Sequence, residues 1–284
     1  MGRRTVLVTG TNGRLGSAVA CRLAAEYDVV QLDVKEPEPG QAGFGRVLVG
    51  SITDLDTVER AVDGVDAVVH CAAIPWEKKP FQHLVQVNVM GTLNLLEAAG
   101  VRQRVEHFIY ISSICAHGIL SGPDGGNMPR FLPINEDHPL LLGNYYSCSK
   151  VQAEYWCRKY ADEYRKPVVA VRPSLIIASE AETSMRARPP GETPRLYDYV
   201  ACSDLVEGIV RAMDYYPVDG FDRFLFNAVD QCSTMPSVDL VNRLFPDVEA
   251  DREALRRADG FGALVDCAYA RERLGWIPRV RCQR

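Results

Sequence analysis

The sequence predicts a doubly wound α/β fold, in which a parallel sheet is covered by helices on both faces. Two observations carry this prediction. Short apolar runs alternate with stretches of helical periodicity over residues 5–173, and strands that alternate with helices form parallel βαβ units with right-handed crossovers. A glycine-rich turn, "TGTNGRLG", also follows the first apolar run, which is where such folds bind their ligands.

The elements follow in order along the chain. Leu15, Val19 and Leu23 are spaced four apart and so share one helical face. The apolar runs predict strands at 5–10, 29–34, 45–50, 66–73, 106–113 and 167–173. The periodic stretches predict helices at 14–27, 54–62, 81–100 and 146–164.

The rhythm breaks after Pro173. Residues 179–195 are rich in proline, charge and small side chains, which predicts a long loop. A helix is expected at 203–213, a strand at 223–228, a helix at 237–245 and a terminal helix near 267–276, a tail too short and irregular for an independent domain. We therefore expect a Rossmann domain over residues 1–173. Residues 174–284 would form a small substrate-binding cap, packed on the carboxyl edge of the sheet and partly interleaved with it.

Composition narrows the function. The 284 residues are 47% hydrophobic, enough for a sizeable core, and the net charge of −5 provides no basic field for nucleic acid. No apolar run approaches the roughly 20 residues of a membrane helix, and the N-terminus leads straight into a strand, so we expect a cytoplasmic protein. Nine cysteines without a CxxC pair predict reduced, mostly buried thiols. Five histidines without ligand spacing predict no metal site.

The glycine turn predicts a dinucleotide site. Gly10 permits the tight turn, Gly13 lets the backbone approach a pyrophosphate, and Gly16 allows close packing of helix and strand. The free amides at the start of the helix attract anionic oxygens. Such a turn is weak evidence by itself, because an ordinary βα turn is equally compatible.

Acidic residues refine the choice of cofactor. Asp33 ends the second strand, where a carboxylate accepts hydrogen bonds from the adenosine ribose and repels a 2′-phosphate, so NAD is preferred over NADP. Arg14 would suit a 2′-phosphate, or be a solvated residue at the helix start. Asp54 has two equal interpretations, an adenine contact or a carboxylate at a helix N-terminus. His70 is expected to be a packed strand residue.

The stretch "NYYSCSK" holds the candidate chemistry. Tyr146 lies four residues before Lys150, so the two share a helical face, whereas Tyr145 points elsewhere. A phenol needs its pKa lowered by roughly 2 to 3 units to act as a base near neutrality, and Lys150 with a cationic nicotinamide would supply this shift. Tyr and Lys at this spacing are also common on ordinary helices. Ser112 and Ser113 end the preceding strand, where a substrate would lie.

Together these segments resemble a known family. "TGTNGRLG", "HCAA", "VNVMGTLNLLEAA", "YISSICAHG", "INEDHPL", "YYSCSK" and "VRP", in that order, are similar to the extended short-chain dehydrogenases/reductases, also called the NAD-dependent epimerase/dehydratase family. The resemblance covers nearly the whole chain, including "YDYVACSDLVEGIVRAM" and "RERLGWIP". It implies hydride transfer between a nicotinamide and a secondary alcohol carbon, and a homodimer formed through helices 81–100 and 146–164.

The resemblance also implies roles for residues. Ser113 would bond the substrate oxygen, Tyr146 would be the acid/base, and Lys150 would activate it and bind the nicotinamide ribose, while Ser112 would be structural. The helix asparagine of the family is mostly structural. With the turn and the acidic residues, the expected cofactor contacts are Gly10, Asn12, Gly13, Arg14, Leu15, Gly16, Asp33, Asp54, Ala72, Asn88, Tyr146 and Lys150.

Departures from the family pattern separate its members. Dehydratases place Asp and Glu where this chain has Ile114 and Cys115, so a dehydratase is disfavoured. Some family epimerases use a cysteine at the position of Cys115 as a second acid/base; a small buried residue is the alternative. Nucleotide-sugar members have Asn at Ser174 and often Arg at Tyr197, which puts a diphosphate clamp in doubt.

The compact cap resembles uronate dehydrogenases, which act on free sugar acids, and arginines would suit a carboxylate. The candidate substrate contacts are Cys115, His117, Ser174, Arg186 and Arg195, with Arg188 nearby. We thus expect an NAD-dependent dehydrogenase or epimerase with a carbohydrate-like small-molecule substrate. The alternative is a non-catalytic dinucleotide-sensing protein of the same fold, which has no reason to keep a proton-transfer tyrosine.

Overall fold

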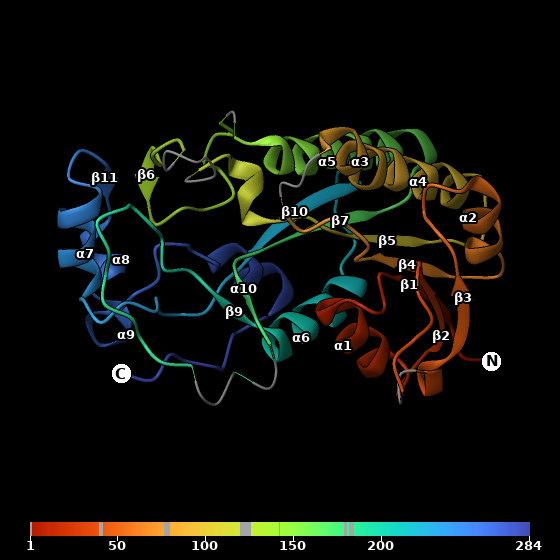
Figure 1. The fold of residues 1–284 in the computed structure, drawn as a ribbon, viewed down its shortest axis with the longest axis horizontal. Helices are drawn as coiled ribbons and strands as arrows, with labels where there is room; N and C mark the ends of the chain where they lie inside the picture. Colours follow the sequence, from red (N-terminus) through yellow and green to blue (C-terminus); the bar gives the residue numbers. More distant parts are fainter. Residues whose placement is uncertain are drawn as a thin grey trace. The chain divides into compact units, whose positions relative to one another are not determined.

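The computed structural model describes residues 2–39, 42–76, 80–119, 126–141, 143–178, 181 and 185–284 (Figure 1). The chain divides into two compact units. The first unit comprises Met1–Ser112, Ser149–Val171 and Ile209–Asp222, and the second comprises Ser113–Cys148, Arg172–Gly208 and Arg223–Arg284. Helices α5 (Tyr145–Tyr164) and α6 (Cys202–Met213) and strands β7 (Val168–Pro173) and β10 (Phe221–Phe226) each begin in one unit and end in the other.

Seven strands form the central sheet, in the order β10-β7-β5-β4-β1-β2-β3. Strands β1, β2, β3, β4, β5 and β7 pair in parallel, which confirms the predicted doubly wound fold. The bounds are β1 Thr5–Thr9, β2 Asp28–Asp33, β3 Arg46–Val49, β4 Ala67–His70, β5 His107–Ile111, β7 Val168–Pro173 and β10 Phe221–Phe226.

Helices cover both faces of this sheet in the first unit. Helix α1 (Arg14–Leu23) lies along one face, and α2 (Leu55–Val62), α4 (Thr92–Gly100) and α5 (Tyr145–Tyr164) lie along the other (Figure 1). The second face is sealed by an apolar cluster that includes Leu7, Val30, Val58, Leu95, Phe108 and Ala153. Because alternate strand residues point to opposite faces, Val6 and Val8 are buried on the side of α1.

The helix predicted over 81–100 has an interruption. It consists of α3 (Phe81–Val85), a π-helical turn η2 (Gln86–Gly91) and α4. A π-turn carries one extra residue per turn and often marks a functional position. Asn88 lies within η2 and is 1% exposed.

The second unit is built of short elements around its own apolar core, which includes Ile114, Ile134, Leu225, Leu240 and Leu264. Its two-residue ladders, β6 with β11 and β8 with β9, are absent from the prediction because they are too short to show a period of two. The remaining bounds are η1 Ala42–Phe44, η3 Ile114–His117, β6 Phe131–Leu132, β8 Ile176–Ile177, β9 Val200–Ala201, α6 Cys202–Met213, α7 Ser237–Leu244, β11 Glu249–Ala250, α8 Arg252–Leu255, α9 Arg257–Gly260 and α10 Ala268–Leu274.

Part of the predicted loop 179–195 is paired rather than irregular. The amide of Ala187 donates to the Gln283 oxygen at 2.8 Å, and the amide of Arg188 donates to the Cys232 oxygen at 2.9 Å. Segment 185–188 is therefore held between two other stretches of the second unit. Residues 179, 180 and 182–184 of the predicted loop lie outside the described residues.

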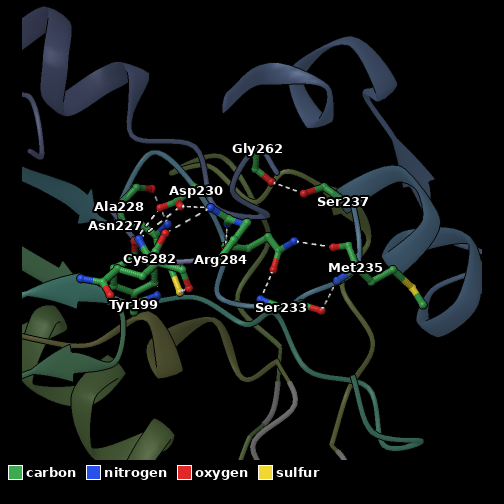
Figure 2. A network of polar contacts seen from close by, with 12 residues as sticks. Tyr199, Asn227, Ala228, Asp230, Ser233, Met235, Ser237, Gly262, Cys282 and Arg284 are labelled. Atoms are coloured by element: carbon green, nitrogen blue, oxygen red, sulfur yellow. Dashed lines mark hydrogen bonds and ion pairs between the residues drawn. The ribbon is translucent and has the colours of Figure 1, made fainter. Parts of the chain in front are cut away.

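A buried carboxylate organises this part of the unit (Figure 2). Asp230 is 1% exposed. It accepts hydrogen bonds from the Tyr199 hydroxyl at 2.5 Å and from the Cys282 amide at 3.3 Å, and it pairs with the Arg284 guanidinium at 2.8 Å. Asp230 thereby holds the stretch 282–284, whose Gln283 pairs with segment 185–188.

The cysteines depart from their prediction. All nine are free thiols in the described structure. Cys157, Cys202 and Cys282 are buried, five others are half-buried, and Cys21 is exposed, so the prediction of mostly buried thiols was wrong. The sequence shows no burial signal for a lone cysteine in a loop or at a helix edge.

Among the described residues, no helix is long and apolar enough to span a membrane.

Candidate active site

The turn after β1 is packed so tightly that two of its glycines have no room for a side chain. Gly10 has φ of 74°, and a Cβ there would lie 2.7 Å from the Ala72 amide nitrogen. A Cβ on Gly16 would lie 2.1 Å from the Gly10 oxygen. Both glycines therefore permit β1, α1 and the segment after β4 to meet, as the spacing predicted.

The first turn of α1 has the features of an anion site. Gly13 is the N-cap of α1 and provides no side-chain cap. A Cβ on Gly13 would lie 3.1 Å from the Gly10 oxygen, a much milder contact than at Gly16. Arg14 is exposed and Leu15 is buried at the same helix end. The uncapped amides and the absence of a Cβ suit the close approach of a phosphate.

Asp33 and Asn12 form the adjoining edge of this turn. One Asp33 oxygen accepts from the Asn12 amide at 2.9 Å, and the other accepts from the Lys35 amide at 3.2 Å. An ionised carboxylate has about four acceptor positions, so two stay available for the hydroxyls of a ribose. The Asn12 side-chain oxygen is buried and has no partner in the described residues. These groups fit the ribose and phosphate portions of a dinucleotide.

Asp54 has a capping role. It is the N-cap of α2 and accepts from the Thr57 amide at 3.1 Å and from the Thr57 hydroxyl. These hydrogen bonds lower the pKa of the Asp54 carboxyl. The helix-end interpretation thus describes its contacts, and an adenine contact stays a prediction.

Beneath the turn, His70 is part of a buried hydrogen-bond chain. Its Nδ1 lies 2.7 Å from the Thr9 hydroxyl, and its Nε2 lies 3.0 Å from the Thr92 hydroxyl. Burial, and secondarily the charge of Lys150, lower the pKa of His70 to about 3, so the ring is neutral. The Thr9 hydroxyl also accepts from the Ala72 amide at 3.1 Å, which fixes the segment expected to pass beneath the cofactor.

Asn88 fixes the same segment from its other side. Its side-chain oxygen accepts from the Ile74 amide at 2.7 Å. Its side-chain nitrogen donates to the Ile74 oxygen at 3.1 Å and to the Ser149 hydroxyl at 3.1 Å. Both amide hydrogens are thus used within the protein, which supports the structural role that the family resemblance implies.

Lys150 is a buried cation in α5. It is 3% exposed and donates to the Ile111 oxygen at 2.8 Å, at the end of β5. Its ammonium lies 5.1 Å from the centre of the Tyr110 ring. These contacts fix the end of the lysine side chain.

In the second unit, Ser113, Cys115 and Tyr146 come together. Ser113 caps the 3-10 helix η3, and its hydroxyl oxygen accepts from the Cys115 amide at 3.1 Å. Tyr146 is 9% exposed, whereas Tyr145 is 53% exposed. Burial, and secondarily the proximity of Cys115, raise the pKa of Tyr146, while a hydrogen bond from Ser113 lowers it.

The candidate substrate residues have different surroundings. His117 is completely buried, with its Nε2 3.2 Å from the Arg172 guanidinium, and burial lowers its pKa to about 3. Ser174 is buried, and burial raises the pKa of the Asp198 carboxyl near it. Arg186 and Arg195 are exposed.

Two residues of this region are absent from the predicted set. The Ser147 hydroxyl donates to the Cys115 oxygen at 2.5 Å, and the Asn144 side chain accepts from the Ser147 amide at 2.9 Å. The sequence signal for Asn144 is its place just before a helix, where asparagine is a preferred N-cap residue; three residues separate it from Cys148. Ser147 had no such signal, because its hydroxyl contacts a distant segment.

Comparisons with known proteins identify the family that this chain resembles. The model of the NAD dependent epimerase/dehydratase family matches residues 6–191. An NAD-dependent glucose-6-phosphate dehydrogenase of Haloferax volcanii is 34% identical over 59% of this chain and 66% of that protein. A uronate dehydrogenase of Pseudomonas syringae pv. tomato is 29% identical over 59% of this chain and 58% of that protein. The chain thus matches less than two thirds of the length of these two relatives.

A solved structure extends the likeness to the fold. A short-chain dehydrogenase/reductase superfamily protein from Agrobacterium tumefaciens with bound NAD has a TM-score of 0.74 at 23% identity, covering 98% of this chain and 93% of that one. The family match includes the glycine turn, Asp33, Ser113, Tyr146 and Lys150. The chain therefore belongs to the NAD dependent epimerase/dehydratase family.

Proposed function

We propose that this protein is an NAD-dependent dehydrogenase of a free sugar, sugar phosphate or sugar acid, with Tyr146 as the acid/base. The observation that carries the proposal is the burial of Tyr146 beside Ser113 and Cys115, on a helix in which Lys150 follows one turn later. The two curated relatives named above are dehydrogenases of such substrates. An epimerase of the same family is the second candidate, since Cys115 lies beside Tyr146.

The proposed cofactor contacts fall into two groups. The turn from Gly10 to Gly16 would hold the pyrophosphate, and Asp33 would accept hydrogen bonds from the adenosine ribose. When bound, NAD accepts or donates a hydride at its nicotinamide ring. A carboxylate at Asp33 that is already shared by two backbone amides is fixed in place, which favours NAD over NADP.

The proton chemistry is assigned to Tyr146. As substrate is oxidised, its O–H proton would pass to the ionised Tyr146 oxygen, the carbon that bears this hydroxyl would give up its hydride to the bound NAD, and the C–O bond would become a carbonyl. In the reverse direction Tyr146 returns that proton. Burial alone would keep the Tyr146 phenol protonated, and so unable to act as a base, because burial raises its pKa. The Ser113 hydrogen bond favours the phenolate, and the Lys150 ammonium is proposed to supply the remaining stabilisation.

Lys150 is suited to this role by its own contacts. Its ammonium donates to the Ile111 carbonyl oxygen at 2.8 Å, in a buried position. A cation held in this way would act on its neighbours without side-chain reorganisation.

A pair of adjacent tyrosines provides the test. Tyr146→Phe is expected to retain NAD affinity and to lose turnover by roughly 10³-fold or more. Tyr145→Phe, at the exposed neighbour, should stay near the parent activity. NADH formation would be followed with free sugars, sugar phosphates, sugar acids and UDP-sugars. Near-parent turnover of Tyr146→Phe would refute the proposed mechanism.

The cofactor content separates the remaining alternatives. A dehydrogenase exchanges its cofactor at every turnover, whereas an epimerase retains it through oxidation and re-reduction. Denaturing the purified protein and measuring the released nicotinamide should give a largely empty protein that binds added NAD. Stoichiometric NAD would favour the epimerase. NAD binding without turnover on any substrate class would favour a dinucleotide-sensing protein.

We also propose a homodimer formed through α5 and the helix segment 81–100. Each of these helices carries exposed apolar side chains in the first unit: Tyr155 is 78% exposed, Trp156 41% and Met90 47%. Large apolar side chains in water favour association. Light scattering should give twice the chain mass, and Tyr155→Glu should reduce it.

A further inference from the structure

We propose that Ser147 is a positioning residue for the Ser113 and Tyr146 pair, an inference that rests on the proposed function. Ser147 directly follows Tyr146 and is 1% exposed. Its hydroxyl donates a 2.5 Å hydrogen bond to the backbone oxygen of Cys115. All of these residues belong to the second unit.

The acceptor lies in the turn that carries Ser113. The Ser113 hydroxyl oxygen accepts from the Cys115 amide at 3.1 Å, and the Ser113 backbone oxygen accepts from the Ala116 amide at 3.0 Å. The Cys115 oxygen accepts a second bond from the Gly118 amide at 2.9 Å. The turn is therefore closed by its own hydrogen bonds and moves as a unit when its Cys115 carbonyl is displaced.

The donor lies in the first turn of α5. The Ser147 amide donates to the Asn144 side chain at 2.9 Å, as expected at a helix N-cap. Serine hydroxyls inside helices usually bond a carbonyl three or four residues earlier in the same helix. The Ser147 hydroxyl instead reaches a residue 32 positions away. It is thus a cross-link between the Ser113 turn and the turn of α5 that holds Tyr146.

This cross-link determines how Ser113 meets Tyr146. The Ser113 hydroxyl has one hydrogen, and its oxygen is already oriented by the Cys115 amide. Without the Ser147 bond, the turn can shift away from α5 and the hydrogen bond to Tyr146 lengthens. Ser147 would act through Ser113 and would touch neither substrate nor cofactor.

The expected consequence is a change in proton affinity. Of the groups that face Tyr146, the Ser113 hydroxyl lowers its pKa, and Cys115 from the same turn raises it. Lys150 follows one turn later in α5 as the cationic group. Weakening the Ser113 bond leaves burial and Cys115 less opposed, so the pKa of Tyr146 should rise.

The test is the pH profile of kcat/KM for Ser147→Ala. Its ascending limb should move up by roughly half to one pH unit, and kcat should fall roughly tenfold with KM for NAD unchanged. Ser147→Thr, which keeps the hydroxyl, should restore the limb. Asn144→Ala is the matched control, because it loosens the same helical turn without touching Cys115 and should leave the limb in place.

Two results would overturn the inference. One is a Ser147→Ala limb that coincides with the parent limb; the other is an equal shift in Asn144→Ala. If Ser147→Ala does not fold, Ser147→Cys preserves the shape with a weaker donor and should show the same shift at smaller size. An active Tyr146→Phe would defeat the proposed function itself. An inactive Tyr146→Phe with an unshifted Ser147→Ala defeats only this inference.

Discussion

Ser112 donates a 2.5 Å hydrogen bond to the carboxylate of Glu154, and both residues are buried in the first unit. Ser113, the next residue, contributes its hydroxyl to the Cys115 turn in the second unit. The two serines directly follow β5, and the extended backbone of Ser113 turns its side chain away from that of Ser112, so the two hydroxyls have different partners. The pair therefore separates a structural hydroxyl from the proposed catalytic one.

Ser112→Ala should destabilise the protein while leaving turnover near the parent value. The substitution leaves the buried Glu154 carboxylate without this donor, at a cost of about 1 to 3 kcal/mol in the free energy of unfolding. Urea unfolding and steady-state rates would measure the two quantities. Ser113→Ala is the control and should lose turnover with little loss of stability. The opposite pattern would reverse the assignment of the two serines.

Gly13→Ala and Gly16→Ala should fail for different reasons. The Cβ of Gly16→Ala meets the Gly10 oxygen at 2.1 Å, so overpacking should lower the free energy of unfolding by about 1 to 3 kcal/mol. The Cβ of Gly13→Ala meets that oxygen only at 3.1 Å. Gly13→Ala should therefore fold almost normally and lose NAD affinity, because its methyl group occupies the proposed pyrophosphate path. NAD titration and thermal unfolding measure both; unchanged NAD affinity in Gly13→Ala would place the pyrophosphate elsewhere.

The parts of the fold that the sequence predicted are those with a long or repeated signal. Buried parallel strands are continuous apolar runs, and the helices over the sheet have an apolar residue every three or four positions. All seven strands of the sheet and helices α1, α2, α5, α6 and α7 were therefore located to within a few residues. The Tyr146 and Lys150 spacing was readable for the same reason, since both residues lie on one regular helix.

The parts that escaped prediction depend on contacts between distant residues. No residue type in the sequence marks the π-turn η2, and the structural role of its Asn88 is seen only from the hydrogen bonds to Ile74. The pairing of Ala187 with Gln283 joins two irregular stretches that have no periodicity. The Ser147 bond to Cys115 spans 32 positions and follows from tertiary structure alone.

Asp230→Asn should loosen segment 185–188 as well as destabilise the second unit. Removing the charge takes away the ion-pair partner of Arg284, and because a quarter of that side chain is exposed, we expect a cost of about 1 to 3 kcal/mol in the free energy of unfolding. The stretch 282–284 then loses its anchor, and with it the Gln283 bond to Ala187. Trypsin should cleave after the exposed Arg186 faster in the variant than in the parent. Equal cleavage rates would show that segment 185–188 is held independently of Asp230.

Glu136 should make the protein less stable as pH rises through neutrality. Its carboxylate accepts from the Leu225 amide at 2.8 Å, and burial, with a smaller contribution from Asp266, raises its pKa to about 7 from 4.5 in the unfolded chain. A raised pKa means that the folded state binds the proton more tightly. The stabilisation is therefore fully present below pH 4.5 and is lost as pH rises through 7, by up to about 3 kcal/mol.

Glu136→Gln should remove this dependence, because the amide keeps an oxygen for the Leu225 amide and has no proton to lose. Urea unfolding at pH 5 to 8 should show the variant gaining stability relative to the parent as pH increases. The neutral His70 has the opposite sign: with its pKa lowered to about 3, its contribution is lost as pH falls below 6.5. That contribution is common to both proteins and cancels in their difference. Asp137→Asn, at the exposed neighbour, is the control. If the free energy of unfolding of Glu136→Gln ran parallel to that of the parent from pH 5 to 8, ionising Glu136 would have no such cost.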